Sequence, residues 1–428
     1  MEKNNIPEFE KIIRNEKVVL VDPVSKVYLG VSNKIANNLD KQEVKEFLYP
    51  IWKKQASIQQ KIIQRHEKFN TVYLMITRKC NMNCDFCAIN ANHGMNLDAE
   101  INIDDIKKKI IPFLNECSPH KFIMTGGEPF VKDNILQIIE EIHKGTSIPI
   151  IVQSNGIAVN TSVIEKLKGK VKEIDFSTKH MFGEMGKADE LISNIEICQQ
   201  SGIDVVLSFI YEKSNKKELY EVIDIAAKYN TGLLVNIVAP VGRAREKVEF
   251  LTDLDKIQMN LDIAKYIYDH GYEEKALCGV IDSHLQVRNA CGGYGKVLAI
   301  FPEGNIYMCQ CLEDDTYRLG NVLYDEVETI ENNLCDKMGE RVIQKTFCVD
   351  DKDICNKCEY RYFCTGKCQT SVDKDDYTCY FVKKMIDYQL FYKKMGTPKK
   401  VLEEYITYMN QCLLCISLYT YSKWVELV

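Results

Sequence analysis

The middle of the chain alternates between short apolar runs and longer segments with helical periodicity. Six apolar runs are typical of strands buried on both faces, at 71–77, 122–127, 149–156, 173–179, 204–212 and 232–239. Apolar residues three and four positions apart then predict helices at 103–115, 133–144, 161–167, 188–200, 215–229 and 253–270. Buried strands that alternate with helices predict a parallel sheet with right-handed crossovers. Six units are too few for an eight-stranded barrel, so we predict an α/β fold with a partial (β/α)6 TIM-like barrel.

The last predicted helix carries signals at both ends. Thr252 and Asp255 have the spacing of a capping box, and Gly271 follows as a stop signal. In a barrel of this kind the chemistry lies in the loops at the C-terminal ends of the strands. Four unusual segments follow predicted strands there: three cysteines, then GGEP, SNG and PVGRA.

The segments on either side of the barrel have different patterns. Residues 17–31 read as two short strands around an Asp-Pro turn, and an amphipathic helical region follows them. A cysteine-rich region comes after the barrel and leads into a helical tail. We therefore predict four parts: a small α+β domain at 1–68, the barrel at 69–275, the cysteine-rich domain at 276–385 and the tail at 386–428.

Composition and charge narrow the class of protein. The 428 residues are 46% hydrophobic, which is enough for two or three domains with real cores. A net charge of -6 argues against a nucleic-acid binder. The polar N-terminus does not resemble a signal peptide, and no apolar run has the length of a membrane span. We expect a cytoplasmic protein without a nucleic-acid or membrane partner.

The chain has 18 cysteines. Disulfides rarely persist in a reducing compartment, so metal or redox chemistry is the better interpretation. Three cysteines lie within residues 80–87, and most of the others lie between Cys278 and Cys379. Cys117, Cys198 and Cys335 are interpreted as buried packing residues. Two metal regions on either side of a cysteine-poor middle are therefore predicted.

The first group has the spacing C-x3-C-x2-C, at Cys80, Cys84 and Cys87, directly after the first strand. Three thiolates can hold three irons of a 4Fe–4S cube and leave the fourth iron open to another ligand. Zinc sites favour pairs of cysteines and four ligands, and only His93 follows nearby as a further candidate. The spacing therefore favours an iron–sulfur cluster over zinc.

This motif and the Gly-Gly-Glu-Pro segment at 126–129 resemble those of the radical S-adenosylmethionine (SAM) enzymes, over about residues 69–272. The resemblance implies that SAM binds the open iron and is cleaved to a 5′-deoxyadenosyl radical, which abstracts hydrogen from the substrate. It further implies cofactor contacts from Phe86, Gly126, Gly127, Glu128, Asn155, Ser177, Ser208 and Arg243. For the last four, a turn residue or a solvated polar residue is the alternative.

The second group runs C-x12-G-x4-C, then C-x2-C-x5-C-x3-C, then one more cysteine. Only five residues separate Cys358 from Cys364, too few for the usual zinc-ribbon loop. The series resembles the SPASM extension of radical SAM enzymes, which carries one or two auxiliary iron–sulfur clusters. By that resemblance the first cluster would take Cys291, Cys309 and Cys368, and the second would take Cys355, Cys358, Cys364 and Cys379. Four candidates stay open for the fourth ligand of the first cluster: Cys278, Cys311, Cys348 and a substrate thiolate.

The SPASM resemblance implies net oxidation of a peptide or protein. Residues 1–68 look like a shortened leader-recognition domain, which binds a leader peptide as an added strand; a simple cap on the barrel is the alternative. We predict a radical SAM maturase that crosslinks a ribosomally made precursor peptide. The predicted crosslink is a thioether from a cysteine sulfur to a carbon.

The resemblance also implies cofactors and an electron donor, and it leaves alternative functions open. It implies SAM, three 4Fe–4S clusters and a flavodoxin- or ferredoxin-type electron donor. The alternatives are a carbon–carbon crosslinking maturase, a formylglycine-forming sulfatase maturase and a non-catalytic iron–sulfur electron-transfer protein. The GGEP segment argues against the last, because an electron carrier needs no turn that binds the methionine part of SAM.

Overall fold

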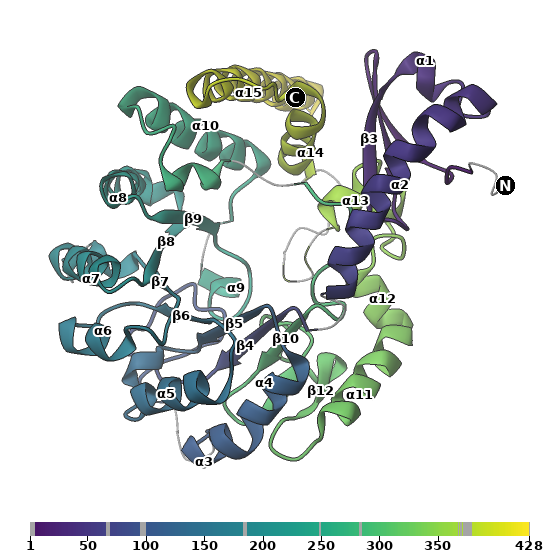
Figure 1. The fold of residues 1–428 in the computed structure, drawn as a ribbon. Coiled ribbons are helices and arrows are strands. Elements are labelled where there is room, and N and C mark those ends of the chain that lie inside the picture. Colours follow the sequence, from purple (N-terminus) through teal and green to yellow (C-terminus); the bar gives the residue numbers. More distant parts are fainter. Residues whose placement is uncertain are drawn as a thin grey trace.

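A nine-stranded sheet forms the centre of the computed structural model, which describes residues 5–65, 69–94, 100–182, 186–247, 250–281, 285–366, 368, 370 and 379–427. The strand order is β12-β11-β10-β4-β5-β6-β7-β8-β9. Six neighbouring strands run parallel: β4 (Thr71–Met75), β5 (Lys121–Thr125), β6 (Ile150–Ser154), β7 (Glu173–Ser177), β8 (Asp204–Tyr211) and β9 (Gly232–Ile237). The predicted α/β fold with a parallel sheet is confirmed, and its curvature is consistent with a partial barrel (Figure 1).

Helices line the outer face of the curved sheet (Figure 1). They are α3 (Ile103–Asp105), η1 (Ile106–Ile110), α4 (Ile111–Cys117), α5 (Ile135–Gly145), α6 (Thr161–Leu167), α7 (Ala188–Gln200), α8 (Lys216–Tyr229) and α10 (Asp253–His270). The predicted capping box of α10 is present, and Gly271 ends the helix with a φ of 69°. The helix predicted over 103–115 is instead interrupted by η1, a single π-helical turn.

Alternate residues of the strands face opposite sides of the sheet. Val72 and Leu74 of β4 are fully buried in the main core, which includes Ile138 and Ile142 of α5. Tyr73 and Met75 belong to a separate apolar group with Ala299, Phe301 and Tyr307. Burying an aliphatic side chain of this kind stabilises the fold by about 1.5–3 kcal/mol. At β4 the sheet is therefore buried on both faces, as its continuous apolar run predicts, whereas Leu234 and Ile237 of β9 are exposed.

The C-terminal region extends this sheet, which the sequence analysis did not predict. Strand β10 (Val297–Ile300) pairs in parallel with β4, and β11 (Asn305–Tyr307) and β12 (Arg318–Asn321) continue antiparallel from it. The helices α11 (Val327–Gly339), α12 (Arg341–Phe347), η8 (Cys355–Lys357) and α13 (Arg361–Cys364) follow. The cysteine-rich region is thus joined to the barrel by backbone pairing with its first strand.

The N-terminal segment forms an antiparallel sheet of three strands, not the two predicted. These are β1 (Glu10–Arg14), β2 (Lys17–Asp22) and β3 (Val27–Ser32), followed by α1 (Asn33–Ala36) and α2 (Gln42–Arg65). Strand β1 was missed because its short apolar stretch lies between charged residues and its turn uses Asn15, a residue other than glycine, with a φ of 54°. The helical region predicted after the strands is broken between α1 and α2.

This small sheet has two covered faces. One face packs against α2, with Leu20, Leu29 and Leu48 buried between them. The other face contributes Ile12, Val19 and Val21 to an apolar cluster with the cysteine-rich region. Arg14 adds ion pairs to Glu359 at 2.5 Å and Asp387 at 3.0 Å, so the N-terminal sheet is fixed to that region.

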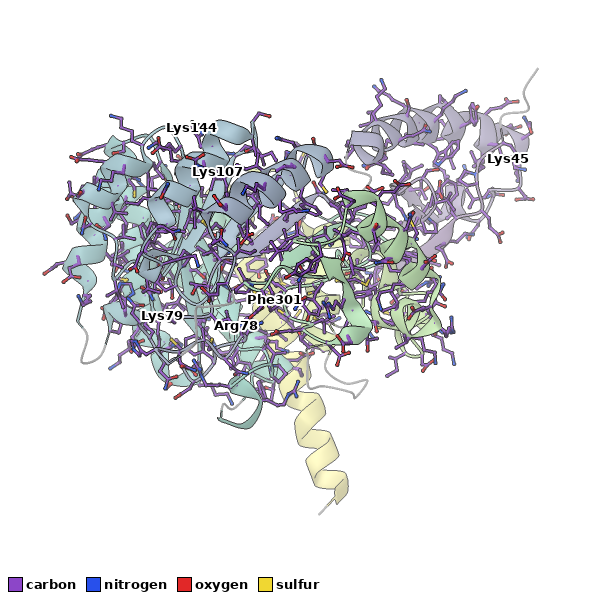
Figure 2. All side chains as sticks on the ribbon, turned by 90° about the horizontal axis from the view of Figure 1, so that it is seen from below. Lys45, Arg78, Lys79, Lys107, Lys144 and Phe301 are labelled. Carbon is purple, nitrogen blue, oxygen red and sulfur yellow. The ribbon has the colours of Figure 1, made fainter. Side chains whose placement is uncertain are left out.

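The chain ends in α14 (Tyr380–Asp387), the π-helical turn η10 (Tyr388–Tyr392) and α15 (Pro398–Leu427). Leu402, Tyr405 and Met409 of α15 join the main core, and the far end of the helix extends away from the molecule (Figure 2). The boundary predicted after residue 385 falls within α14.

Within the described ranges, no helix has the length and apolar character needed to cross a membrane. The remaining short elements are η2 (Pro129–Val131), η3 (Lys179–Met181), η5 (Lys213–Asn215), α9 (Ala244–Lys247), η6 (Ala276–Val280) and η7 (Asp315–Tyr317).

Candidate active site

A cavity of about 260 Å³ lies at the C-terminal ends of the barrel strands. Its lining includes Cys80, Cys84 and Cys87. It also includes seven of the eight residues predicted to contact the cofactor: Phe86, Gly127, Glu128, Asn155, Ser177, Ser208 and Arg243. A larger cavity of about 880 Å³ lies between the N-terminal hairpin and α15, but no cysteine lines it. We take the smaller cavity as the candidate active site because it brings the chemically distinctive loops together.

The cysteine loop is closed by the segment that follows β9. The guanidinium of Arg243 donates to the carbonyl of Cys84 at 2.8 Å and to that of Ala91 at 3.0 Å, and its backbone N–H donates to the Cys87 carbonyl at 3.1 Å. Gly242 has a φ of 57°, and a β-carbon there would lie 2.2 Å from the carbonyl oxygen of Cys87. This close backbone approach requires glycine. In this structure Arg243 therefore holds the loop through its carbonyls.

The Gly-Gly-Glu-Pro turn packs against the backbone that leads into Cys80. The N–H of Gly127 donates to the Thr77 carbonyl at 2.8 Å, and the N–H of Glu128 donates to the Lys79 carbonyl at 2.9 Å. A β-carbon on Gly127 would lie 2.2 Å from the Lys79 oxygen. Gly126, the eighth predicted residue, has a φ of 147° and lies against Thr77. The two glycines thus set the distance between the turn and the cysteine loop.

Glu128 is a buried carboxylate with three donors. It accepts from the Ser154 hydroxyl at 2.8 Å, from the Asn155 N–H at 2.6 Å and from the Phe130 N–H at 3.0 Å. Burial raises the pKa of Glu128, and these hydrogen bonds act against that rise. An ionised carboxylate has about four lone-pair sites, so Glu128 can accept one more donor, such as an ammonium group.

The remaining predicted residues lie around the same cavity. The Asn155 amide donates to the Asn81 side chain at 2.7 Å and lies 4.0 Å from the sulfur of Cys80. Ser177 and Ser208 are paired across β7 and β8. The Lys179 ammonium lies 5.4 Å from the centre of the Phe86 ring. A flat aromatic surface, hydroxyls and amides at one cavity suit a nucleoside, as the resemblance implies.

Asp175 lines the cavity and was missed by the sequence analysis. One carboxylate oxygen accepts from the Gln153 amide at 3.3 Å, and the other is buried without a hydrogen-bond partner. Burial raises the pKa of Asp175, against the effects of Gln153, Glu173 and Lys121. The sequence did hold a signal, since an acid in a strand predicted to be buried on both faces is unusual.

The three thiols at the cavity are close enough for their charges to interact. Burial raises the pKa of Cys80, and the neighbouring charges of Glu128, Cys84 and Cys87 raise it further, whereas the N–H of Met82 donates to its sulfur at 3.3 Å and lowers it. Within the described ranges, no three His, Cys, Asp or Glu side chains close on a single metal ion. Three thiols that line one cavity without closing on a single ion fit a 4Fe–4S cluster, in which each thiolate binds a different iron.

The second cysteine region contains two groups of thiols. The Cys364 thiol is close enough to Cys355, Cys358 and Cys379 for their charges to raise its pKa, after burial, which is the largest cause. Cys309 and Cys311 hydrogen-bond each other, and the charge of Cys368 acts on Cys311. Ala290 forms an antiparallel β-bridge with Cys348, and the N–H of Cys291 donates to the Phe347 carbonyl at 3.0 Å. Cys335 is exposed, so its prediction as a buried packing residue was wrong, whereas Cys198 is buried.

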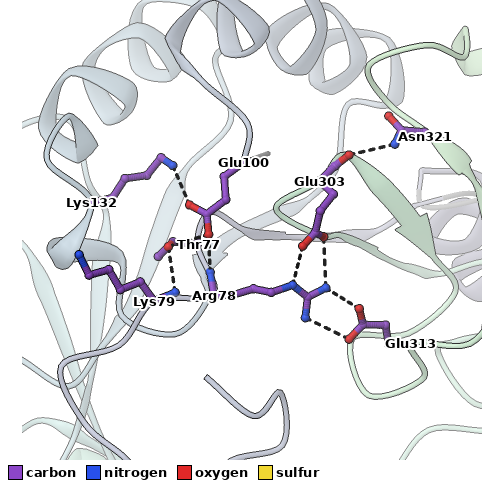
Figure 3. A network of polar contacts seen from close by, with 8 residues as sticks. All are labelled: Thr77, Arg78, Lys79, Glu100, Lys132, Glu303, Glu313 and Asn321. Atoms are coloured by element: carbon purple, nitrogen blue, oxygen red, sulfur yellow. Dashed lines mark hydrogen bonds and ion pairs between the residues drawn. The ribbon is translucent and has the colours of Figure 1, made fainter. Parts of the chain in front are cut away.

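Arg78, two residues before Cys80, connects the cysteine loop to the C-terminal sheet extension (Figure 3). Its guanidinium donates to Glu303 at 2.6 and 3.1 Å and pairs with Glu313. It also lies 5.3 Å from the centre of the Phe301 ring (Figure 2). On its other side, the backbone N–H of Arg78 donates to Glu100, which pairs with Lys132 (Figure 3). Glu303 and Glu313 lie on either side of Cys309 and Cys311 in the chain, so this network links the two cysteine regions.

Comparison with known proteins finds the radical SAM family for the barrel, the family that its motifs resemble. Residues 74–226 match the Radical SAM superfamily. The GTP 3′,8-cyclase of Clostridium perfringens strain SM101 is 26% identical over 301 residues, which cover 64% of this chain and 88% of that protein. Mycofactocin maturase MftC of Mycolicibacterium smegmatis is 23% identical over 273 residues, covering 58% of this chain and 66% of that protein.

Two solved structures share the fold over most of this chain. Streptococcus suis SuiB bound to S-adenosylmethionine has a TM-score of 0.55 at 13% identity, covering 87% of this chain and 96% of that chain. The enzyme anSMEcpe with bound AdoMet and the Cp18Cys peptide has a TM-score of 0.53 at 14% identity, covering 82% of this chain and 99% of that chain. The family match contains the cysteine loop, the Gly-Gly-Glu-Pro turn and strands β5 to β8, whereas β9 and Arg243 lie outside it. Residues 74–226 of this chain therefore form a radical SAM domain.

Proposed function

We propose that this enzyme is a maturase that crosslinks a cysteine sulfur to a carbon within a ribosomally made peptide. The observation that carries the proposal is the second cysteine region, in which three thiols lie near the Cys364 thiol and a further pair lies at Cys309 and Cys311. A radical SAM site needs only the first three cysteines, so these additional thiols call for another role. Auxiliary iron–sulfur clusters would give an oxidation an electron acceptor.

Forming a thioether removes two hydrogens from the peptide. One leaves as a hydrogen atom, and the other leaves the thiol as a proton while one electron is released. SAM bound at the 4Fe–4S cluster of the first cysteine loop would supply the radical chemistry that removes the hydrogen atom. Cys80, Cys84 and Cys87 would hold this cluster, with Glu128 toward the methionine amino group and Ser177 and Ser208 toward the ribose.

We propose that Asp175 is the base that accepts the proton from the substrate thiol. Its carboxylate lines the cavity, one oxygen has no hydrogen-bond partner, and burial raises its pKa, which makes the carboxylate a stronger base. Gln153 orients the other oxygen from the neighbouring strand. This assignment gives each of the two departing hydrogens a destination within one site.

Two further features support a peptide substrate. The solved anSMEcpe complex of the same fold holds a cysteine-containing peptide by its title, and MftC is named a maturase. The N-terminal sheet has β3 at one edge, where an extended leader peptide could add as a fourth strand. The low-potential electron for the first cluster would come from a flavodoxin- or ferredoxin-type donor.

Mass spectrometry with thiol alkylation tests the proposal. The anaerobically reconstituted enzyme is incubated with SAM, a reductant and synthetic cysteine-containing peptides taken from short reading frames beside the gene. We expect a product lacking two hydrogens and carrying one fewer alkylatable cysteine. Unchanged free thiols with the same mass loss would indicate a carbon–carbon crosslink, and an aldehyde trapped by hydrazide would indicate formylglycine formation. GTP serves as the control substrate, because the similarity to the GTP 3′,8-cyclase makes GTP an alternative substrate. Conversion of GTP without peptide modification would refute the proposal.

A further inference from the structure

Glu100 and Lys132 form a buried ion pair next to the cysteine loop (Figure 3). The Lys132 ammonium lies 3.1 Å from one carboxylate oxygen of Glu100, and the two side chains are only 11% and 2% exposed. Taking two charges out of water costs free energy that their attraction repays only with good geometry and further hydrogen bonds. Both residues lie outside the described lining of the cavity, so they do not act on its contents directly. The position of the pair in the interior therefore needs an explanation.

The second carboxylate oxygen of Glu100 holds the backbone that leads into Cys80. It accepts from the Thr77 hydroxyl at 2.9 Å and from the Arg78 N–H at 2.8 Å. The Thr77 hydroxyl in turn accepts from the N–H of Lys79 at 3.1 Å. Glu100 follows the three cysteines in the chain, whereas Thr77 precedes them. One carboxylate thus joins the two ends of the segment that carries the cysteines.

Lys132 brings the Gly-Gly-Glu-Pro turn to the same carboxylate. Its backbone N–H donates to the Pro129 carbonyl at 3.1 Å, at the end of η2. Glu128 begins η2, and its side chain caps the turn by accepting from the Phe130 N–H at 3.0 Å. A single helical turn therefore connects the side chain of Glu128, which lines the cavity, to Lys132, which pairs outside it.

The same two segments also meet through their backbones. The N–H groups of Gly127 and Glu128 donate to the carbonyls of Thr77 and Lys79 at 2.8 and 2.9 Å. These bonds form one contact between the turn and the start of the cysteine loop, and the ion pair forms a second (Figure 3). Two separate contacts restrict rotation between two segments, which one contact alone allows.

We propose that Glu100 and Lys132 are positioning residues, which hold Glu128 in place relative to the cysteine loop. SAM would need both at once, because its methionine part would meet Glu128 and the iron left open by Cys80, Cys84 and Cys87. The ion pair acts on the cofactor only through these residues. The inference rests on the radical SAM domain and not on the peptide substrate, so it can fail while the proposed function holds.

The test is calorimetric titration of SAM into the anaerobically reconstituted full-length protein. Lys132→Met leaves the Glu100 charge buried without its partner, so this variant should be destabilised. The double variant Glu100→Gln/Lys132→Met removes both charges and should melt near the wild-type temperature. Its Kd for SAM should still rise about tenfold at unchanged iron content, the effect typical of groups that orient a binding residue. Lys132→Arg keeps the charge and should restore SAM binding.

Electron paramagnetic resonance (EPR) of the reduced protein gives a second readout, since the double variant should need about ten times more SAM for the same spectral change. Lys170→Met is the matched control, because it breaks the ion pair of Lys170 with Glu140 at 3.3 Å, on the outer helices, and should leave SAM binding unchanged.

Three results would overturn the inference. A double variant that binds SAM as tightly as wild type would show that the pair does not position Glu128. A double variant that loses the iron of the first cluster would show that the pair is needed to form the loop and not to place it. Equal weakening of SAM binding in Lys170→Met would show that the effect is not specific to this pair.

Discussion

The two cysteine regions are positioned by different kinds of structure. Cys80, Cys84 and Cys87 follow a barrel strand, and two further loops bond their backbone, one at the Gly-Gly-Glu-Pro turn and one at Arg243. The C-terminal cysteines lie in short turns and helices, fixed to the barrel by the pairing of β10 with β4 and by Arg78. Regular parallel strands thus hold the radical site, whereas local turns and a few long-range contacts hold the auxiliary thiols. Substitutions in the first region should abolish cofactor chemistry, and those in the second should uncouple it from product.

The largest effect is expected for Cys84→Ala. Removing one of three thiolates should abolish SAM cleavage and remove about four irons per chain, because the cluster loses a ligand that nothing nearby replaces. Cys335→Ala is the control, since this exposed cysteine on α11 has no proposed role. Iron analysis and chromatography of 5′-deoxyadenosine measure the outcome. SAM cleavage at the wild-type rate in Cys84→Ala would contradict the assignment.

Asp175→Asn should reduce peptide crosslinking by roughly a hundredfold and leave SAM cleavage largely intact, because only the proton acceptor is lost. In wild type, crosslinking should decline as the pH falls through the raised pKa of Asp175, since the base must be ionised. The ratio of crosslinked peptide to 5′-deoxyadenosine, measured against pH, reports this step. Equal ratios in both proteins would argue against Asp175 as the base.

The stability of Asp175→Asn separates a folding defect from a catalytic one. Burial raises the pKa of Asp175, so the stability that its protonated form contributes is present at low pH and is lost as the pH rises through the folded-state pKa. Asparagine carries no charge, so the variant should be at least as stable as wild type at neutral pH. Thermal melts at several pH values check this, and a large destabilisation at neutral pH would make the activity loss uninformative.

Gly127→Ala tests the backbone contact between the two loops. The added β-carbon would meet the Lys79 carbonyl, so we expect a loss of about 1–3 kcal/mol in unfolding free energy and weaker SAM binding. Gly279→Ala is the matched control, because no atom lies within 4 Å of the position of its added β-carbon. Denaturant unfolding and calorimetric titration with SAM measure the two effects. Similar behaviour of both variants would remove the case for close packing at this turn.

The smallest effect is expected for Arg78→Ala, which breaks the link between the two regions. Its carboxylate partners are partly exposed, so the loss should be about 1–2 kcal/mol. Lys107→Ala, which breaks an exposed ion pair on the outer helices, should cost less than about 0.5 kcal/mol. The Arg78 variant should also release less product per SAM cleaved, because the auxiliary region is held less firmly. An unchanged ratio would restrict Arg78 to a structural role.

The radical SAM barrel was the part most open to prediction from sequence. Continuous apolar runs identified its strands, and the rule that chemistry follows strand ends located the loops around the cavity. A single acid within an apolar run is a signal, but Asp175 was missed because the run does not indicate toward which face of the sheet its side chain points. The hydrogen bonds from Arg243 to the carbonyls of the cysteine loop could not be predicted either, because Arg243 and Cys84 are 159 positions apart in the sequence.

The C-terminal region could be read only through the spacing of its cysteines. Strands β10 to β12 are three or four residues long, too short for a clear period. The pairing of β10 with β4 joins segments more than 200 positions apart, which local patterns do not encode.

The most direct test of the difference between the two regions is an EPR titration of the reduced full-length protein with SAM. We predict that SAM changes one iron–sulfur signal, that this signal is absent when Cys80, Cys84 and Cys87 are all replaced by alanine, and that the remaining signals do not respond to SAM. A wild-type spectrum unaffected by SAM, or a triple variant whose spectrum still responds to it, would contradict the assignment of the radical site to the barrel loop.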